Sequence, residues 1–208
     1  MPDKSPKTPN GRRSSGRMSA FPIPGLDTKK STRIAAILQE RLVSLIDLSL
    51  TLKHIHWNVV GPNFIGVHLM LDSQVAAVQV MVDSNAERIA TLGVSPNGQV
   101  GFVAKARSWD DYALGRANVL EHLGGLDVVS VGVIEGHRKA VDELEDLDLV
   151  TQDMLIAQLA ELEQCHWFVR AHLEADSGAL STAGAHTETQ AAAAAMKAAS
   201  ARRSRSAN

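Results

Sequence analysis

The chain has 208 residues, 45% of them hydrophobic, a length that allows one domain with a sizeable core and two tails. Its single cysteine, Cys165, excludes an internal disulfide framework and fits a reducing, cytoplasmic compartment, and without a long apolar run we expect neither a membrane span nor a signal peptide. The net charge of −2 is unevenly divided: residues 1–20 carry +4, residues 181–208 carry +3, and the segment between them carries −9.

The first predicted elements are a disordered arm and two long helices. Residues 1–20 are rich in Pro, Gly and Ser and cannot bury a core, so we predict disorder there. A helix capped by Asp27 or Thr28 is predicted to continue to Gly61, because leucines and isoleucines recur at steps of three and four. A second helix is predicted over residues 64–92, since no proline interrupts it and a glycine follows it.

The second half of the chain begins with a long crossover. Residues 93–108 form a loop by their Pro and Gly content, and the segment SWDDYALG predicts a brief helical turn capped by Ser108. A third helix is predicted from about residue 116 to 144, and a fourth from 149 or 151 to 173. Four glycines weaken the third helix unless close packing requires them.

These elements predict an all-α protein. Four amphipathic helices with a long crossover after the second indicate a ferritin-like four-helix bundle with a short extra helix in the crossover. We place this domain at residues 21–178. Residues 179–208, rich in Ala and Arg, are predicted to form a disordered basic tail.

The predicted helix over residues 64–92 carries an unusual polar stripe. At 100° per residue, its members fall within about 100° of arc and project from one face; they are His68, Asp72, Asp83 and Glu87. Asp72 and Asp83 lie roughly 16 Å apart along a helix, too far to share a metal ion. The two pairs could meet only if a second copy of the helix ran antiparallel to the first, so the spacing predicts metal sites shared between subunits.

A further histidine candidate lies upstream, in KHIHWN. His54 and His56 are about 200° apart around a helix, so at most one faces a given site, and His56 beside Trp57 is the better candidate. Imidazole and carboxylate ligands suit iron, manganese or zinc rather than calcium. Any one such residue is usually solvated, but five together favour a metal site.

A family resemblance is carried by HWNVVGPNFIGVHLMLD, DSNAER, LSLTLK and WFVRAHLE. Over residues 21–178 the chain resembles the Dps proteins, DNA-binding proteins from starved cells, within the ferritin superfamily. The resemblance implies a hollow dodecamer, built from two-fold dimers, that oxidises Fe(II), preferably with hydrogen peroxide. Ferric mineral would be stored inside, and DNA on the nucleoid would be protected from oxidative damage.

The resemblance also implies roles for individual residues. One subunit would supply His56, His68 and Asp72 to the ferroxidase centre, and its neighbour would supply Asp83 and Glu87. Trp57 would take up stray oxidising equivalents, with plain packing as the other interpretation. Leu69 stands where many relatives have Glu, but that position is not a ligand position, so the ligand set is whole.

Two charged features have predicted roles. The acidic segment VDELEDLDLVTQD is our candidate for an iron-entry pore at a three-fold axis, with a solvated turn as the other interpretation; the pore residues are Asp142, Glu143, Asp146 and Asp148. The tails lack aromatic residues and base-reading motifs, so their DNA binding should be non-specific and salt-dependent. The tail cations are Lys4, Lys7, Arg12, Arg13, Arg17, Lys197, Arg202, Arg203 and Arg205.

Three alternatives stay open from the sequence. A bacterioferritin-like protein of 24 subunits would carry an ExxH signature on two helices, whereas this chain has one match, Glu163 with His166. A structural nucleoid-compacting protein would keep an idle metal site. The centre could also hold Zn²⁺ or Mn²⁺ in place of iron, because ligand type alone does not decide.

Overall fold

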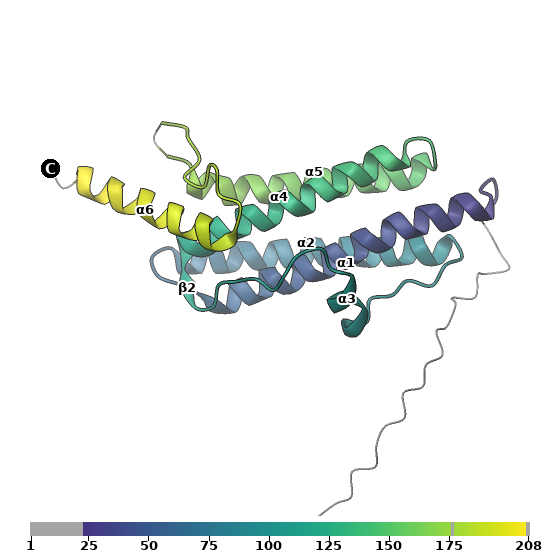
Figure 1. Ribbon diagram of the computed structural model, residues 1–208, viewed down its shortest axis with the longest axis horizontal. Helices are drawn as coiled ribbons and strands as arrows, with labels where there is room; N and C mark the ends of the chain where they lie inside the picture. The colour runs from purple at the N-terminus through teal and green to yellow at the C-terminus, as the bar shows by residue number, and fades with distance from the viewer. Residues whose placement is uncertain (1–22, 176, 207–208) are drawn as a thin grey trace, which may run out of the picture.

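Four long helices form the body of the protein in the computed structural model, which describes residues 23–175 and 177–206 (Figure 1). The predicted ferritin-like bundle is confirmed. Its helices are α1 (Thr28–Asn58), α2 (Phe64–Thr91), α4 (Val119–Leu144) and α5 (Leu149–Leu173). The basic arm over residues 1–20 lies outside the described residues.

The helices begin where the sequence offers caps. The Asp27 carboxylate accepts a hydrogen bond of 2.8 Å from the backbone N–H of Lys30 at the start of α1. At α4, Asn118 and Glu121 form a capping box, in which each side chain accepts a hydrogen bond from a backbone N–H of the first turn. The third helix therefore begins three residues later than predicted, at its cap, while α5 spans 149–173 as predicted.

The bundle is built from two helical hairpins whose apolar faces meet. α1 packs mainly against α2, and α4 against α5, with the crossover running along the first pair (Figure 1). The apolar stripe of α1 is fully buried, as its spacing predicts; it includes Ile34, Leu38, Leu42, Leu45 and Ile55. One short parallel pairing joins β1 (Val59–Val60) to β2 (Ala117–Asn118) and so fixes the end of the crossover beside the end of α1.

The extra helix of the crossover is present, but the predicted position was wrong. It is α3 (Val100–Ala106), and the segment after it is not helical. Instead of serving the first turn of a helix, the carboxylate of Asp111 and the carbonyl of Asp110 bond to the guanidinium of Arg107, which also donates to buried Asp47 at 3.0 Å. Arg107 thereby ties the crossover to α1 in extended form.

The C-terminal tail also differs from prediction. We expected disorder over residues 179–208, but α6 (Glu188–Ser206) is a helix that packs on α4 (Figure 1). Ala191, Ala192 and Ala195 are buried in this contact. The two helices approach each other closely, and glycine is needed at position 124 because a Cβ there would lie 2.7 Å from the carbonyl oxygen of Ala191. A run of alanines has high helix propensity, and here a glycine gives it a surface to pack on.

Gly124 provides a direct test of this docking. Gly124→Ala is expected to displace α6, because the added methyl group collides with its backbone, and amide exchange in residues 188–206 should accelerate at least about tenfold. Gly132→Ala, on the same helix with nothing within 4 Å of the added methyl, is the matched control and should raise stability by about 1 kcal/mol. Unchanged exchange in Gly124→Ala would show that α6 does not depend on this contact.

A buried carboxylate ties α5 and the following segment to α4. Asp127 accepts hydrogen bonds from His166 Nε2 at 2.6 Å, Arg170 Nε at 2.8 Å and Thr182 Oγ1 at 2.7 Å. Burial raises the pKa of Asp127, but these three donors outweigh it and bring the pKa to about 2. The carboxylate is therefore ionised and fully engaged, and it anchors the segment that leads to α6.

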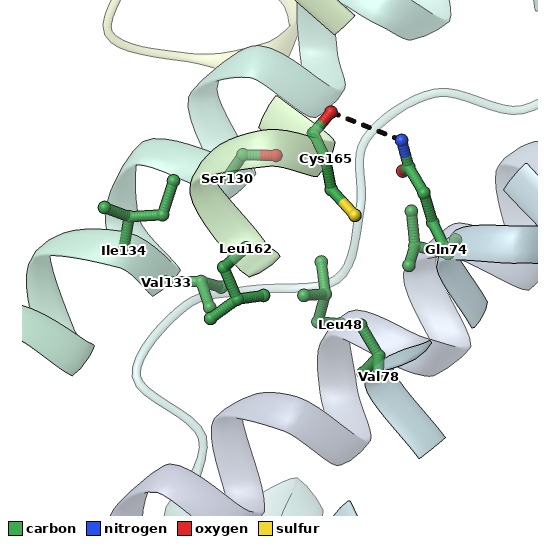
Figure 2. Close-up of a pocket in the computed structure, with 9 residues that line it drawn as sticks. Leu48, Gln74, Val78, Ser130, Val133, Ile134, Leu162 and Cys165 are labelled. Atoms are coloured by element: carbon green, nitrogen blue, oxygen red, sulfur yellow. Dashed lines mark hydrogen bonds between the residues drawn. The ribbon is translucent and has the colours of Figure 1, made fainter. Parts of the chain in front are cut away.

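Cys165 lies at a small cavity inside the bundle (Figure 2). The cavity holds about 20 Å³ and is lined mainly by aliphatic side chains from all four helices, including Leu48, Val78 and Leu162. Gln74 Nε2 donates to the Cys165 carbonyl at 3.3 Å across it. Cys165 is half-buried, and this burial raises the pKa of its thiol, so it is a poor nucleophile at neutral pH. The cavity has room for about one water molecule.

Among the described helices, α2 alone has the length and apolar content of a membrane span, with a mean hydropathy of 1.4 over its best 18-residue window. The sequence analysis expected no long apolar run and did not identify this segment, which meets the criteria of length and composition alone. Val67, Leu71, Val75 and Val78 are buried in the bundle, whereas Ile65, Leu69 and Val80 are exposed. An α2 with one face in the core and a second apolar face outside is typical of a helix that packs against another subunit.

Candidate metal centre

Three predicted ligands meet where α1 ends and α2 begins. One ligand atom each from His56, His68 and Asp72 lies within 4.8 Å of the others. The tight turn between the helices brings His56, in the last turn of α1, beside His68, in the second turn of α2, and it uses a positive φ at Gly61 and Asn63. No other group of three His, Cys, Asp or Glu side chains with this spacing occurs in the described part of the chain.

The two imidazoles orient each other. Their rings stack with centroids 3.6 Å apart, and each Nδ1 lies 3.1 Å from the backbone carbonyl of the other histidine. A carbonyl oxygen only accepts, so each Nδ1 carries a proton, and Nε2 is the ring atom whose lone pair can bind a metal ion. This second contact fixes the tautomer that metal-binding histidines need.

Asp72 is held by a lysine that the sequence interpretation missed. Lys53 Nζ donates to Asp72 Oδ1 at 2.6 Å, and the same oxygen lies 3.4 Å from Nδ1 of His56. The hydrogen bond from Lys53 is the main reason that the pKa of Asp72 is lowered, so the carboxylate is ionised and ready to bind a cation. A signal was present, because Lys53 precedes His56 by three residues and so shares its face of α1.

The remaining two predicted ligands lie elsewhere in the same chain. Asp83 and Glu87 are exposed on α2, eleven residues or more beyond Asp72, and do not join the three-residue group. The long rise along the helix keeps them apart, as expected from the sequence. A single chain thus presents a three-ligand half-site at one end of α2 and a separate carboxylate pair toward its other end.

The half-site has an uncovered apolar border. Trp57 follows His56 and is 73% exposed, and Ile65 and Leu69 on α2 are 61% and 58% exposed. Leu69 therefore stands on the outer surface beside His68 and takes no part in the ligand group. Large apolar side chains around a polar site fit a surface that a second subunit covers.

His54 faces away from the half-site. Its Nε2 lies 2.7 Å from the carbonyl oxygen of Leu114 in the crossover, while His56 points to Asp72. The two histidines have different partners, as the 200° separation predicts.

The acidic segment between α4 and α5 is partly engaged in structural contacts. Asp148 caps α5 through the backbone N–H of Thr151 and pairs with Arg88 at 2.6 Å, and Glu143 pairs with Arg33. Burial raises the pKa of Asp148, but the hydrogen bonds from the Thr151 hydroxyl and from Arg88 outweigh it and lower the pKa. Asp142 and Asp146 have exposed side chains. Only part of the predicted pore group is thus exposed to solvent on this surface.

The single ExxH match does not form a metal site. Glu163 pairs with Arg138, whereas His166 donates to Asp127 in the buried network. The two side chains have separate partners on α4, so the described residues give no support to a bacterioferritin-type centre.

Comparison with known proteins identifies the family to which this chain belongs. The family model for the ferritin-like domain matches residues 35–178, so the chain is a ferritin-like protein. It is 57% identical over 175 residues to the DNA protection during starvation protein of Mycolicibacterium smegmatis, a match that covers 84% of this chain and 96% of that protein.

Solved structures agree with the sequence match. Dps of Mycobacterium smegmatis in its tetragonal form matches with a TM-score of 0.77 and 58% identity, covering 78% of this chain and 99% of that one. DpsA14 from Streptomyces coelicolor matches with a TM-score of 0.77 and 51% identity, covering 80% and 99%. The chain belongs to the Dps family of ferritin-like proteins.

Proposed function

We propose that this protein is a mini-ferritin that oxidises Fe(II) with hydrogen peroxide at centres shared between two-fold-related subunits and stores the ferric product in a hollow dodecamer. The main support for this proposal is the preformed half-site of His56, His68 and Asp72. It lies apart from Asp83 and Glu87, which are farther along α2. In an antiparallel pair of α2 helices, each half-site faces the carboxylate pair of the partner.

The residues have complementary tasks in this reaction. Neutral imidazoles with Nε2 lone pairs bind Fe(II), and carboxylates stabilise the Fe(III) that forms. Lys53 has to release Asp72 when the substrate cation arrives, because both use the same carboxylate. Two Fe(II) ions side by side give two electrons to one peroxide, which leaves as water and releases no hydroxyl radical.

The proposal is tested by adding Fe(II) and then hydrogen peroxide anaerobically to the purified protein and counting iron after size exclusion. Many irons per particle, eluting near twelve times the 22.3 kDa chain, are expected. A shell of that size without iron would instead support a structural nucleoid-compacting protein.

We also propose that the protein lies on the nucleoid in the cytoplasm and binds DNA without sequence preference through its basic ends. The described part of this surface is the C-terminal half of α6, which carries Lys197, Arg202 and Arg203. Arg202 donates to the carbonyl oxygen of Glu174, so this half of α6 also contacts the end of α5. Repeated over many subunits, weak phosphate contacts add up to firm binding.

Charge removal in the two ends separates their contributions. Changing Lys197, Arg202, Arg203 and Arg205 to Ala should lower DNA affinity and flatten the plot of log affinity against log salt by about 0.9 for each phosphate that the variant no longer neutralises. The matched variant removes Lys4, Lys7, Arg12, Arg13 and Arg17. If a chain that carries both sets of substitutions binds DNA at low salt as tightly as the wild type, the basic ends are not the binding surface.

The exposed part of the acidic segment is our candidate for iron entry. Asp142→Asn with Asp146→Asn should slow iron uptake several-fold at low ionic strength, because carboxylates at a pore raise the local Fe(II) concentration. The expected loss shrinks as salt is added. Glu161→Gln, which removes an exposed carboxylate of α5 outside the acidic segment, is the control. An unchanged uptake rate in the double variant would remove the pore assignment.

A further inference from the structure

Tyr112 is the only tyrosine of the chain, and the crossover lays it against α4. Its hydroxyl oxygen lies 3.3 Å from Nδ1 of His122 and 3.2 Å from the carbonyl oxygen of the same residue. The contact depends on a glycine, because a Cβ on Gly125 would lie 2.5 Å from the tyrosine hydroxyl. A phenol and an imidazole are thus held within hydrogen-bond distance by the packing of α4.

The protonation states of this pair are set by burial. Burial, and then the negative charge of Glu188, raise the pKa of Tyr112, so the phenol keeps its proton at neutral pH. Burial lowers the pKa of His122, whose side chain is fully buried, so this imidazole is neutral. A protonated phenol beside a neutral imidazole can give up its proton as soon as it loses an electron.

The pair is connected to the candidate metal centre. The ring of His54 meets the ring of Tyr112 edge to face, with centroids 5.9 Å apart. His54 precedes the predicted ligand His56 by two residues on α1, a rise of about 3 Å along the helix axis. His54 and His56 face opposite sides of α1, so the route from the phenol to the half-site is one aromatic contact followed by the stretch of α1 between these two residues.

We propose that Tyr112 is an electron donor to the metal centre, used when a single Fe(II) meets hydrogen peroxide, and that His122 takes up the phenolic proton. This inference rests on the proposed ferroxidase function. Fe(II) gives one electron and becomes Fe(III), Tyr112 gives the second and becomes a neutral tyrosyl radical, and the O–O bond of peroxide breaks to leave two hydroxide ions. The phenolic proton stays on His122 Nδ1.

The cycle closes with a second metal ion. The next Fe(II) reduces the tyrosyl radical and becomes Fe(III), and the proton returns from His122 to the phenol. The sum is the same as in the paired reaction, two Fe(II) for one peroxide. A centre that is only half filled thus avoids releasing hydroxyl radical, which one Fe(II) alone would produce from peroxide.

The test uses the full-length protein with one Fe(II) per centre, mixed anaerobically with hydrogen peroxide and frozen within milliseconds for EPR. A tyrosyl radical signal is expected in the wild type, and growth on ring-deuterated tyrosine should narrow it without altering the fold. Tyr112→Phe should lose the signal and yield more spin-trapped hydroxyl radical per Fe(II) oxidised. Trp109→Phe, an aromatic change in the same loop, should keep the signal.

Fe(II) consumption, measured in the same samples, separates the two proposals. If Fe(II) is oxidised faster than in protein-free buffer but no signal responds to the deuterated tyrosine, Tyr112 is not an electron donor and the ferroxidase proposal stands. If Fe(II) is oxidised by peroxide no faster than in protein-free buffer, the ferroxidase proposal fails, and the role of Tyr112 fails with it.

Discussion

Replacing His68 by Ala is expected to slow peroxide-dependent Fe(II) oxidation by about 100-fold or more, because even residues that only support a metal ligand contribute 10- to 100-fold. The change removes one Nε2 donor and also the ring that stacks on His56 and bonds to its carbonyl. His172→Ala is the matched control, since this exposed histidine of α5 bonds only locally to the carbonyl of Phe168. Stopped-flow absorbance of Fe(III) measures the rate.

A complementation experiment shows whether the centre is shared between subunits. His68→Ala and Asp83→Asn chains should each be inactive alone. In a two-fold dimer that contains one of each, one of the two centres receives an intact half-site from one chain and an intact Asp83 from the other. Random mixing of equal amounts should therefore restore about a quarter of the wild-type rate. If Asp83→Asn alone stays active, the carboxylate pair is not part of the centre; if both variants are inactive alone and mixing restores nothing, the centre is not shared between the two chains.

The largest expected effect on stability comes from Asp127. Asp127→Ala leaves His166 and Arg170 without their buried acceptor, and a loss of about 3 kcal/mol in the free energy of unfolding is expected. Asp111→Ala is the control, because its side chain is 96% exposed and its pair with Arg107 should contribute well under 1 kcal/mol. Urea unfolding at one fixed protein concentration measures both.

The same carboxylate gives stability a defined pH dependence. The pKa of Asp127 is about 2 in the folded chain, below its ordinary value of 3.8, so protons bind the unfolded chain more readily. The contribution, about 2 kcal/mol, is therefore fully present above roughly pH 5 and is lost as pH falls through 4 toward 2. In Asp127→Asn this part of the acid dependence should vanish. An unaltered acid dependence in that variant would assign the effect to other carboxylates.

Periodicity and caps made most of the bundle predictable. The ends of α1, α2, α4 and α5 fall within about three residues of the predictions, because the apolar stripes and the caps at Asp27 and Asp148 are local signals. The position of α3 was not predictable in this way, since long-range pairing of Arg107 with Asp47 decides where the crossover stays extended. The order of the tail likewise depends on Gly124, some 65 residues earlier in the chain.

For the candidate site too, residues related by helical periodicity could be predicted, whereas those identified by a contact in the folded structure could not. His56, His68 and Asp72 could be found because a helical period aligns them across one short turn. Lys53 was missed because a lysine on a helix is usually solvated and only its contact with Asp72 in the folded chain shows its partner. The distance between the half-site and Asp83 could be calculated from the helical rise, because both lie on α2.

The docked position of α6 has a geometric consequence for the proposed binding of DNA. A loose tail would allow a broad distribution of distances between a particle and the duplex it holds. A helix of 19 residues, about 28 Å long and fixed at its N-terminal half on α4, extends past the end of the bundle and carries its cations at a set radius (Figure 1). Condensates formed through α6 should therefore show a sharp interparticle spacing in small-angle scattering.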